Sequence, residues 1–232
     1  IKAPVEELSK EKNLTESGKY YLNLAIEQAR QLTSVVTQLM DFQKVDVGKE
    51  HLLPSMTDIV KLVSNRRIML ASFAKSKNIE LLFVPDRESY ITAVDESKME
   101  KIIDNLISNA IKYSHNNSQI LIDLRCDDKK WILQVKDNGI GISKKAQRQL
   151  FKEFYRGDNA INSKVVGSGI GLLLVKNYVA MHSGSISCSS QENVGSTFLV
   201  VIPFKSISGK SVATNAPSDI TTASSHIMDV SQ

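Results

Sequence analysis

Apolar residues recur at helical spacing from Tyr20 to about Lys44. They stand at intervals of 3, 4, 3, 4 and 3, at Leu22, Ala25, Ala29, Leu32, Val36 and Leu39. This alternation predicts a helix with a heptad seam. Because a seam of about three heptads is too short to be stable alone, we expect it to pack against another helix. The predicted neighbour is the piece 1–10 across the polar turn 11–18, giving a helical hairpin; an amphipathic helix on a globular core is the alternative.

Beyond this region, strands come mostly in hairpins and helices come singly. Thr57 and Asp58 offer a cap for one helix, and a strongly amphipathic helix runs from Glu96 to about Tyr113. A further helix ends near His182. Strands are predicted at 79–84, 90–94, 119–125, 131–136, 185–189 and 197–203. The pattern predicts an α+β fold, a two-layer α/β sandwich with one mixed sheet.

Length and composition fit this organisation. The 232 residues, 42% of them hydrophobic, are enough for one sizeable core and a small helical appendage. We therefore divide the chain into a hairpin at 1–47, a domain at 51–205, and a Ser- and Thr-rich segment at 206–232 that is typical of a flexible tail or linker.

Charge, cysteines and hydropathy exclude several classes of function. The net charge of +4 is too small and too evenly spread for a nucleic-acid surface, so we expect no nucleic acid as a partner. Cys126 and Cys188 lie in predicted strands without metal-binding spacing, which favours reduced core thiols. No apolar run approaches the length of a membrane span and no signal-peptide pattern is present, so we expect no direct membrane contact.

Polar residues border the apolar stripe of the helix at 96–113. Asn105, Asn109 and Lys112 cluster along that border. An amide oxygen suits a hard cation such as Mg²⁺, and an ammonium group neutralises phosphate oxygens. The cluster therefore suits a metal-bound polyphosphate, although Asn and Lys on a helix border are also typical of a merely solvated surface.

A first glycine cluster, Asp137-Asn138-Gly139-Ile140-Gly141, follows a predicted strand. A tight turn is the simplest interpretation, but a turn needs only one flexible position. Glycines at both 139 and 141 let a flat ring approach the backbone, and the Asp137 carboxylate beside them can accept from an exocyclic amine. This combination favours recognition of adenine.

A second cluster, Gly167-Ser168-Gly169-Ile170-Gly171, comes just before a helix that contains Leu172. Its bare N–H groups at a helix N-terminus suit phosphate, and its GxGxG spacing matches neither the dinucleotide fingerprint nor the P-loop. Between the two clusters, the run 150–156 carries aromatic anchors, including Tyr155, and Arg156 is a candidate for contacting a terminal phosphate. The polar stretch after it has the composition of a mobile lid.

These four pieces, in this order, resemble the N, G1, F and G2 boxes of the ATP-binding domain of sensor histidine kinases, over about His51 to Phe204. The resemblance implies the Bergerat fold shared with gyrase, MutL and Hsp90, with ATP and Mg²⁺ as ligands. It implies Asn109 as the Mg²⁺ ligand, Asp137 as the partner of the adenine amine, and catalytic roles for Asn105, Asn109, Lys112 and Arg156. The nucleotide-binding residues that it implies are Asn105, Asn109, Lys112, Tyr113, Asp137, Gly139, Gly141, Tyr155, Arg156, Gly167, Ser168, Gly169, Ile170, Gly171 and Leu172.

The helical region is similar to the dimerisation and phosphotransfer hairpin of the same family. In that family the acceptor histidine opens a His-Glu/Asp-x-Arg/Lys-x-Pro motif, and none of His51, His115, His182 and His226 opens one here. We therefore expect the acceptor to lie upstream of this chain, which by itself would not autophosphorylate. The resemblance further implies a homodimer through the hairpin and transfer of phosphate to the aspartate of a response-regulator receiver domain, separate or fused C-terminally. It also implies a cytoplasmic location, with the parent protein anchored in the inner membrane.

Two other functions stay open. An ATP hydrolase of the gyrase, MutL or Hsp90 branch would need a glutamate at position 105 to activate water. Asn105 stands there, and an amide cannot act as a general base at neutral pH. A non-catalytic dimerisation or nucleotide-sensing module is the second alternative.

Overall fold

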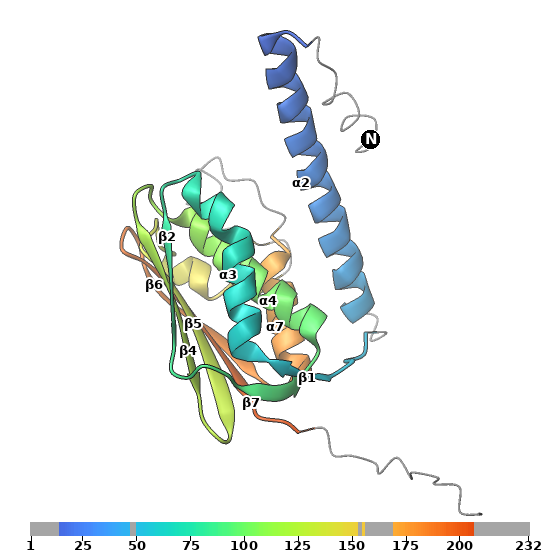
Figure 1. Cartoon of the computed structure of the whole chain (residues 1–232), viewed down its shortest axis with the longest axis vertical. Coiled ribbons are helices and arrows are strands. Elements are labelled where there is room, and N and C mark those ends of the chain that lie inside the picture. The colour runs from blue at the N-terminus through green and yellow to red at the C-terminus, as the bar shows by residue number, and fades with distance from the viewer. Residues whose placement is uncertain (1–13, 47–49, 153–154, 156–168, 207–232) are drawn as a thin grey trace, which may run out of the picture.

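The computed structural model describes residues 14–46, 50–152, 155 and 169–206, which form a long helix followed by a two-layer α/β domain (Figure 1). The helices are α2 (Glu16–Asp46), α3 (Ile59–Lys75), α4 (Glu96–Tyr113), α5 (Lys144–Gln147) and α7 (Gly171–Met181). The strands are β1 (Ser55–Asp58), β2 (Glu80–Pro85), β3 (Ile91–Val94), β4 (Gln119–Cys126), β5 (Lys130–Asp137), β6 (Ser185–Gln191) and β7 (Gly195–Pro203).

Five strands form one mixed sheet in the order β2-β4-β5-β7-β6. Strand β2 runs parallel to β4, and the other neighbours are antiparallel. The predicted two-layer sandwich with a mixed sheet is thus confirmed. The strands β2 and β3 follow one another in the sequence but do not pair, because β3 forms a separate antiparallel pair with β1, a strand that the sequence did not predict.

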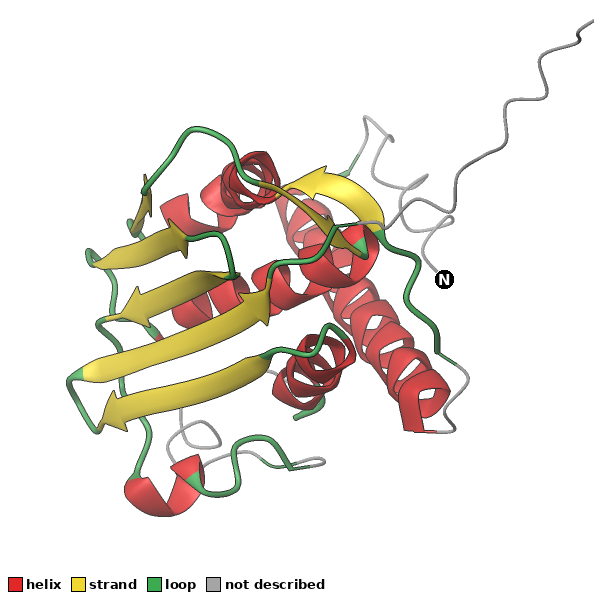
Figure 2. Ribbon diagram, turned by 90° about the horizontal axis from the view of Figure 1, so that it is seen from below, coloured by secondary structure: helices red, strands yellow, loops and turns green. Residues whose placement is uncertain are grey.

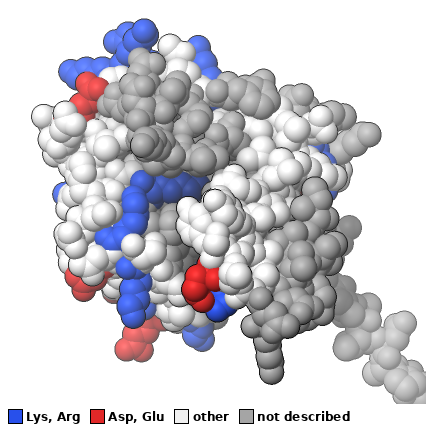
Figure 3. All heavy atoms as spheres, turned by 90° about the horizontal axis from the view of Figure 1, so that it is seen from above, with Lys and Arg blue, Asp and Glu red and all other residues white. Residues whose placement is uncertain are grey.

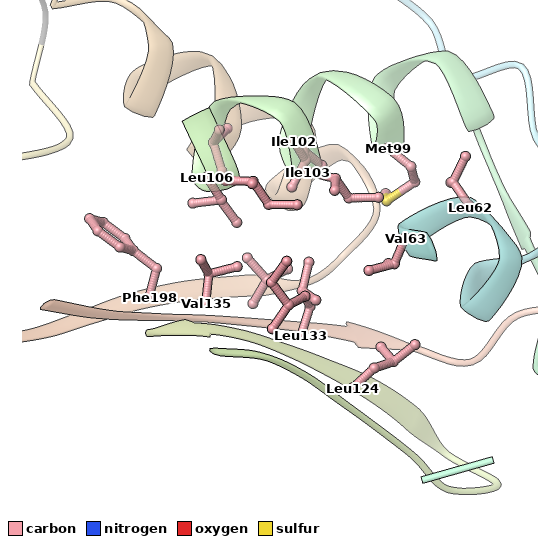
Figure 4. Packing of buried hydrophobic residues seen from close by; sticks show 14 of the residues in the cluster. Leu62, Val63, Met99, Ile102, Ile103, Leu106, Leu124, Leu133, Val135 and Phe198 are labelled. Atoms are coloured by element: carbon pink, nitrogen blue, oxygen red, sulfur yellow. The ribbon is translucent and has the colours of Figure 1, made fainter. Parts of the chain in front are cut away.

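The core lies between the sheet and the helices that cover one of its faces (Figure 2). Strands β4 and β5 bury alternate residues, as a sheet with one covered face requires. Facing them, the apolar stripe of α4 points into the same layer (Figure 4). Fully buried residues from the two sides include Met99, Ile102, Ile103, Leu106, Leu133 and Val135.

Both ends of α4 are fixed by side chains. At its start, the Asp95 carboxylate accepts from the backbone N–H of Lys98 at 3.1 Å. At its end, the Lys77 ammonium group donates to the carbonyls of Ile111 at 2.9 Å, Lys112 at 2.7 Å and Ser114 at 3.2 Å. These contacts place a positive charge at the negative end of the helix dipole and satisfy carbonyls that the helix leaves unpaired.

Helix α2 stands beside the domain and contacts it near its own C-terminal end (Figure 1). The Asp41 carboxylate lies 2.6 Å from the Lys101 ammonium group of α4, and Phe42 packs against the core. Along the predicted seam, Leu32, Val36 and Leu39 remain exposed. The predicted first helix of the hairpin lies within 1–13, outside the described residues. Of the helices that are described, none is both long and apolar enough to cross a membrane.

Both cysteines lie in strands and form no disulfide, as predicted. Cys126 is buried and Cys188 is half-buried. Burial raises the pKa of the Cys126 thiol to about 11 and that of Cys188 to about 12, so both stay protonated at neutral pH.

Candidate functional site

Asp137 ends strand β5 and is only 4% exposed. Its Oδ1 atom accepts from the backbone N–H groups of Gly139 at 3.0 Å and Ser196 at 3.3 Å. Burial raises the pKa of this carboxyl to about 6, although the two N–H groups and the nearby His115 act in the opposite direction. Asp137 is therefore mostly ionised at pH 7, as a buried acceptor whose charge is only partly compensated.

The loop after Asp137 packs between the end of α4 and the β6–β7 hairpin. The Ile140 N–H donates to the Tyr113 carbonyl at 3.1 Å, and Ser114 forms a β-bridge with Gly139. A Cβ atom at position 139 would lie 2.2 Å from that same carbonyl oxygen. At Gly141, where φ is +64°, a Cβ would lie 2.0 Å from the Gln191 carbonyl oxygen. Backbone packing therefore requires both glycines.

The polar border of α4 meets the start of α7 at Asn105. Asn105, Asn109 and Lys112 are half-buried there, and burial lowers the pKa of Lys112. The Asn105 side chain donates from Nδ2 to the Lys101 carbonyl at 2.7 Å. Its Oδ1 lies so close to Gly171 that a Cβ there would be 2.5 Å away. Gly171, the first residue of α7, thus lies against α4 at Asn105, about two helical turns before Tyr113. The distance from Asn105 to Tyr113 along the axis of α4 is about 12 Å.

The N-terminus of α7 carries no side-chain cap from the described residues. Ile170 at the N-cap position is buried, and the preceding Gly169 has a φ of +72°. Leu172, half-buried, packs against the core. Uncapped N–H groups at a helix start form an anion-binding site with the positive end of the helix dipole.

Some predicted site residues have no described place in this arrangement. Arg156, Gly167 and Ser168 lie outside the described residues. Tyr155 is described and half-buried, and it belongs to no helix or strand. Apart from Tyr155, the described part of the predicted site consists of the border of α4, Asp137 with its glycine loop, and the start of α7.

The sequence did not point to three further residues that hold the loop in place. The Ser190 hydroxyl accepts from the Ile142 N–H at 2.8 Å, and the Ser196 N–H donates to Asp137. The Gln147 side chain donates to the carbonyls of Ile142 at 2.7 Å and Ser190 at 2.8 Å. A serine near the end of a strand carries no local signal for such a role, because its partners come from other strands.

Basic side chains lie near the middle of the face that Figure 3 shows. The part of the chain that is described holds no group of three or more His, Cys, Asp or Glu side chains with the geometry of a metal site. The chemistry of this region is therefore that of a single buried acceptor, amides and cations, which suits a polyanionic ligand with a hydrogen-bond donor at one end.

Comparisons with known proteins identify the same region. Residues 94–206 match the family model described as "Histidine kinase-, DNA gyrase B-, and HSP90-like ATPase". Sensor histidine kinase WalK of Bacillus subtilis is 31% identical over 190 residues, which cover 80% of this chain and 30% of WalK. The chain thus spans less than a third of that relative.

Two solved structures share the fold. The structure of full-length ShkA in complex with AMPPNP matches with a TM-score of 0.74 and 22% identity, over 89% of this chain and 43% of that one. The histidine kinase AdeS of Acinetobacter baumannii matches with a TM-score of 0.66 and 21% identity, over 88% of this chain and 95% of AdeS.

Proposed function

Because residues 94–206 belong to the histidine kinase-, DNA gyrase B- and HSP90-like ATPase family, we propose that the chain binds ATP along α4 and supplies it for phosphorylation of a histidine. Asp137 carries this proposal. Its buried carboxylate is fixed through Oδ1 beside a glycine loop, so that it accepts from the exocyclic amine of adenine over Gly139 and Gly141. Tyr113, whose carbonyl holds that loop, lies against the nucleotide.

The phosphates lie at the other end of the same helix border. The start of α7, at Gly171 and Leu172, offers N–H groups that no side chain of the described residues caps. It lies about 12 Å from Tyr113 along the axis of α4, which suits an elongated ligand with adenine at one end and phosphate at the other. Lys112 lies on the same border of α4, one helical turn from Asn109 and two from Asn105, and its long side chain carries an ammonium group for the phosphates. We extend this phosphate site to Gly167, Ser168 and Arg156 from the sequence, with Arg156 on the γ-phosphate.

Magnesium fits this set of donors. The described residues provide no cluster of carboxylates for it, and Mg²⁺ in nucleotide sites is held largely by phosphates and water with one or two protein oxygens. The half-buried amide of Asn109 supplies such an oxygen on the border of α4. When bound, Mg²⁺ neutralises charge on the phosphates.

The acceptor of the γ-phosphate is an imidazole, not water. Asn105 occupies the position at which a hydrolase of this superfamily carries a glutamate, and its amide donates to the Lys101 carbonyl. An amide in that position cannot take a proton from water. We therefore propose that the γ-phosphate passes to a histidine upstream of this chain and then to the aspartate of a response-regulator receiver domain. The relatives named above are histidine kinases, which supports this choice over a hydrolase or a non-catalytic sensing module.

A homodimer through α2 belongs to the same proposal. Its exposed apolar residues, among them Leu32, Val36 and Leu39 of the predicted seam, lie on a helix that has little contact with the domain. An apolar seam of this kind is typical of helices that pair with a second copy. The cytoplasmic location stays a prediction.

The proposal is tested with γ-labelled ATP and Mg²⁺. The chain alone is expected to bind ATP, to release little phosphate and to acquire no acid-labile label. A chain extended upstream to include the acceptor histidine is expected to become labelled. In that longer chain, Asn109→Ala should abolish labelling, whereas Asn116→Ala, at an exposed amide in the turn after α4, should leave it unchanged. Fast phosphate release by the short chain would favour the hydrolase instead.

A further inference from the structure

Three side chains stand in one row across neighbouring strands at the end of the sheet where the glycine loop begins. In the register of the sheet, Asp137 of β5 pairs with Ser196 of β7, and Ser196 pairs with Ser190 of β6. Directly opposed residues on antiparallel strands are close enough for their side chains to interact. Ser190 thus lies two strands from Asp137, and nothing in the proposed function assigns it a role.

The hydrogen bonds of the Ser190 hydroxyl can be assigned completely. A serine hydroxyl has one proton to donate and two lone pairs. Its oxygen lies 2.8 Å from the Gly195 carbonyl, to which it donates, and it accepts from the Ile142 N–H at 2.8 Å. It also lies 3.0 Å from the Ser196 hydroxyl. Because its only proton is used on Gly195, Ser196 must be the donor of that contact.

One of these contacts reaches Asp137 through a single rigid unit. The Gly195 carbonyl and the Ser196 N–H belong to the same planar peptide group. Ser190 holds the oxygen of this group, and its nitrogen donates to Asp137 Oδ1. The direction of one donor to the carboxylate is therefore set by the Ser190 hydroxyl.

The other contact fixes the far end of the glycine loop. The loop leaves Asp137 and reaches Ile142, whose N–H is bound to Ser190. The Gln147 side chain reinforces this position, because it bridges the carbonyls of Ile142 and Ser190. A single hydroxyl thus ties together the end of the loop and the peptide that orients the carboxylate.

We propose that Ser190 is a positioning residue for the adenine end of the nucleotide site, acting on Asp137 through the Gly195–Ser196 peptide and on the glycine loop through Ile142. This inference rests on the proposed binding of ATP. Its distinctive consequence concerns selectivity, because loss of the Ser190 hydroxyl disturbs recognition of the adenine amine while the start of α7 keeps its geometry.

The test compares ATP with purine riboside 5′-triphosphate, which lacks the 6-amine, by calorimetric titration in the presence of Mg²⁺. For Ser190→Ala we expect ATP to bind about tenfold more weakly, the factor expected when the adenine amine loses one well-placed hydrogen bond to the charged Asp137 carboxylate. The analogue, which makes no bond to Asp137, should bind about as well as before, so the ratio of the two affinities falls. Ser190→Thr retains the hydroxyl and should restore the ratio.

Ser189→Ala is the matched control, since Ser189 precedes Ser190 on β6 and its side chain is exposed. It should leave both affinities unchanged. A readout without ligand accompanies the titration: the Ile142 amide should exchange its hydrogen faster in the Ser190→Ala protein and not in the Ser189→Ala protein. If Ser190→Ala folds poorly, Ser196→Ala, which removes only the contact between the two hydroxyls, should lower the same ratio by a smaller factor.

The proposal is overturned if the Ser190→Ala protein binds ATP as the unaltered protein does, or if it weakens both triphosphates equally. If the unaltered protein binds neither triphosphate, the proposed function is wrong and the role of Ser190 falls with it. The two failures are thus distinguished by the unaltered protein alone.

Discussion

Replacing Asp137 by asparagine should stabilise the ligand-free protein while it weakens nucleotide binding. The carboxyl is buried, and its pKa is about 6 in the folded protein against an ordinary value of 3.8. Asparagine keeps an oxygen that accepts from the N–H groups of Gly139 and Ser196. It removes only the charge and the second oxygen, so the change isolates the cost of burying that charge.

The size of the stabilisation follows from the two pKa values. A raised carboxyl pKa means that the folded state holds its proton more tightly, so this group lowers stability as pH rises from about 4 to about 6. A difference of about two pH units corresponds to about 3 kcal/mol. Above pH 6, Asp137→Asn should therefore raise the free energy of unfolding by up to about 3 kcal/mol, and near pH 4 the two proteins should be almost equally stable.

Urea denaturation of the ligand-free proteins from pH 4 to pH 8 measures this difference, and calorimetry at pH 7.5 measures ATP binding. The substitution should weaken ATP by about 1 to 3 kcal/mol, because an amide hydrogen would face the adenine amine. In the unaltered protein, the affinity for ATP should decrease as the pH drops below about 6, because protonation of the Asp137 carboxylate removes the same acceptor. The reasoning is refuted if the substituted protein is less stable at pH 7.5, or if it binds ATP with unchanged affinity.

Three other variants test the fold around the site and the pairing through α2. Lys77→Met removes an ammonium group that three carbonyls share at the end of α4, and should lower the free energy of unfolding in urea by about 1 to 3 kcal/mol. Gly141→Ala places a Cβ atom 2.0 Å from the Gln191 carbonyl oxygen at a residue with positive φ, and should lower the free energy of unfolding in urea by about 1 to 3 kcal/mol or more. An unchanged midpoint of urea unfolding would contradict the described loop. Joint replacement of Leu32 and Val36 by serine should convert a dimer to a monomer in sedimentation, and a monomeric unaltered protein would exclude pairing through α2.

Helix α4 could be predicted from its sequence from end to end, and the partners of the strands could not. The apolar stripe of α4, the Asp95 cap at its start and the basic residue in its last turn all indicate the same helix, so local signals suffice to predict its bounds. Strand β2 looks like the first half of a hairpin, yet it pairs with β4. Next to that pair of strands, Asn78 and Asn117 both have a positive φ, and the Asn78 side chain donates to the Asn117 side chain at 2.7 Å across 39 residues of sequence.

The candidate site divides in the same way. Asp137 and the glycines stand out because residue type and spacing report their chemistry directly. Ser190 and Gln147 act only because β5, β7 and β6 lie side by side, which no short motif encodes. The four-residue strand β1 escaped prediction because Thr57 and Asp58 already account for a helix cap, a role that Asp58 does fill by accepting from the Val60 N–H at 3.1 Å.

The central claim is that ATP lies along α4 between Asp137 and the start of α7, and amide chemical shifts measured during a titration with ATP and Mg²⁺ test it most directly. The largest changes are expected at Gly139, Ile140 and Gly141, at the end of α4, and at Gly171. The amides of β1 and β3, which form the separate two-stranded sheet, should hardly move. Saturable shifts confined to residues outside the glycine loop and α4, or no shifts at millimolar ATP, would contradict the account.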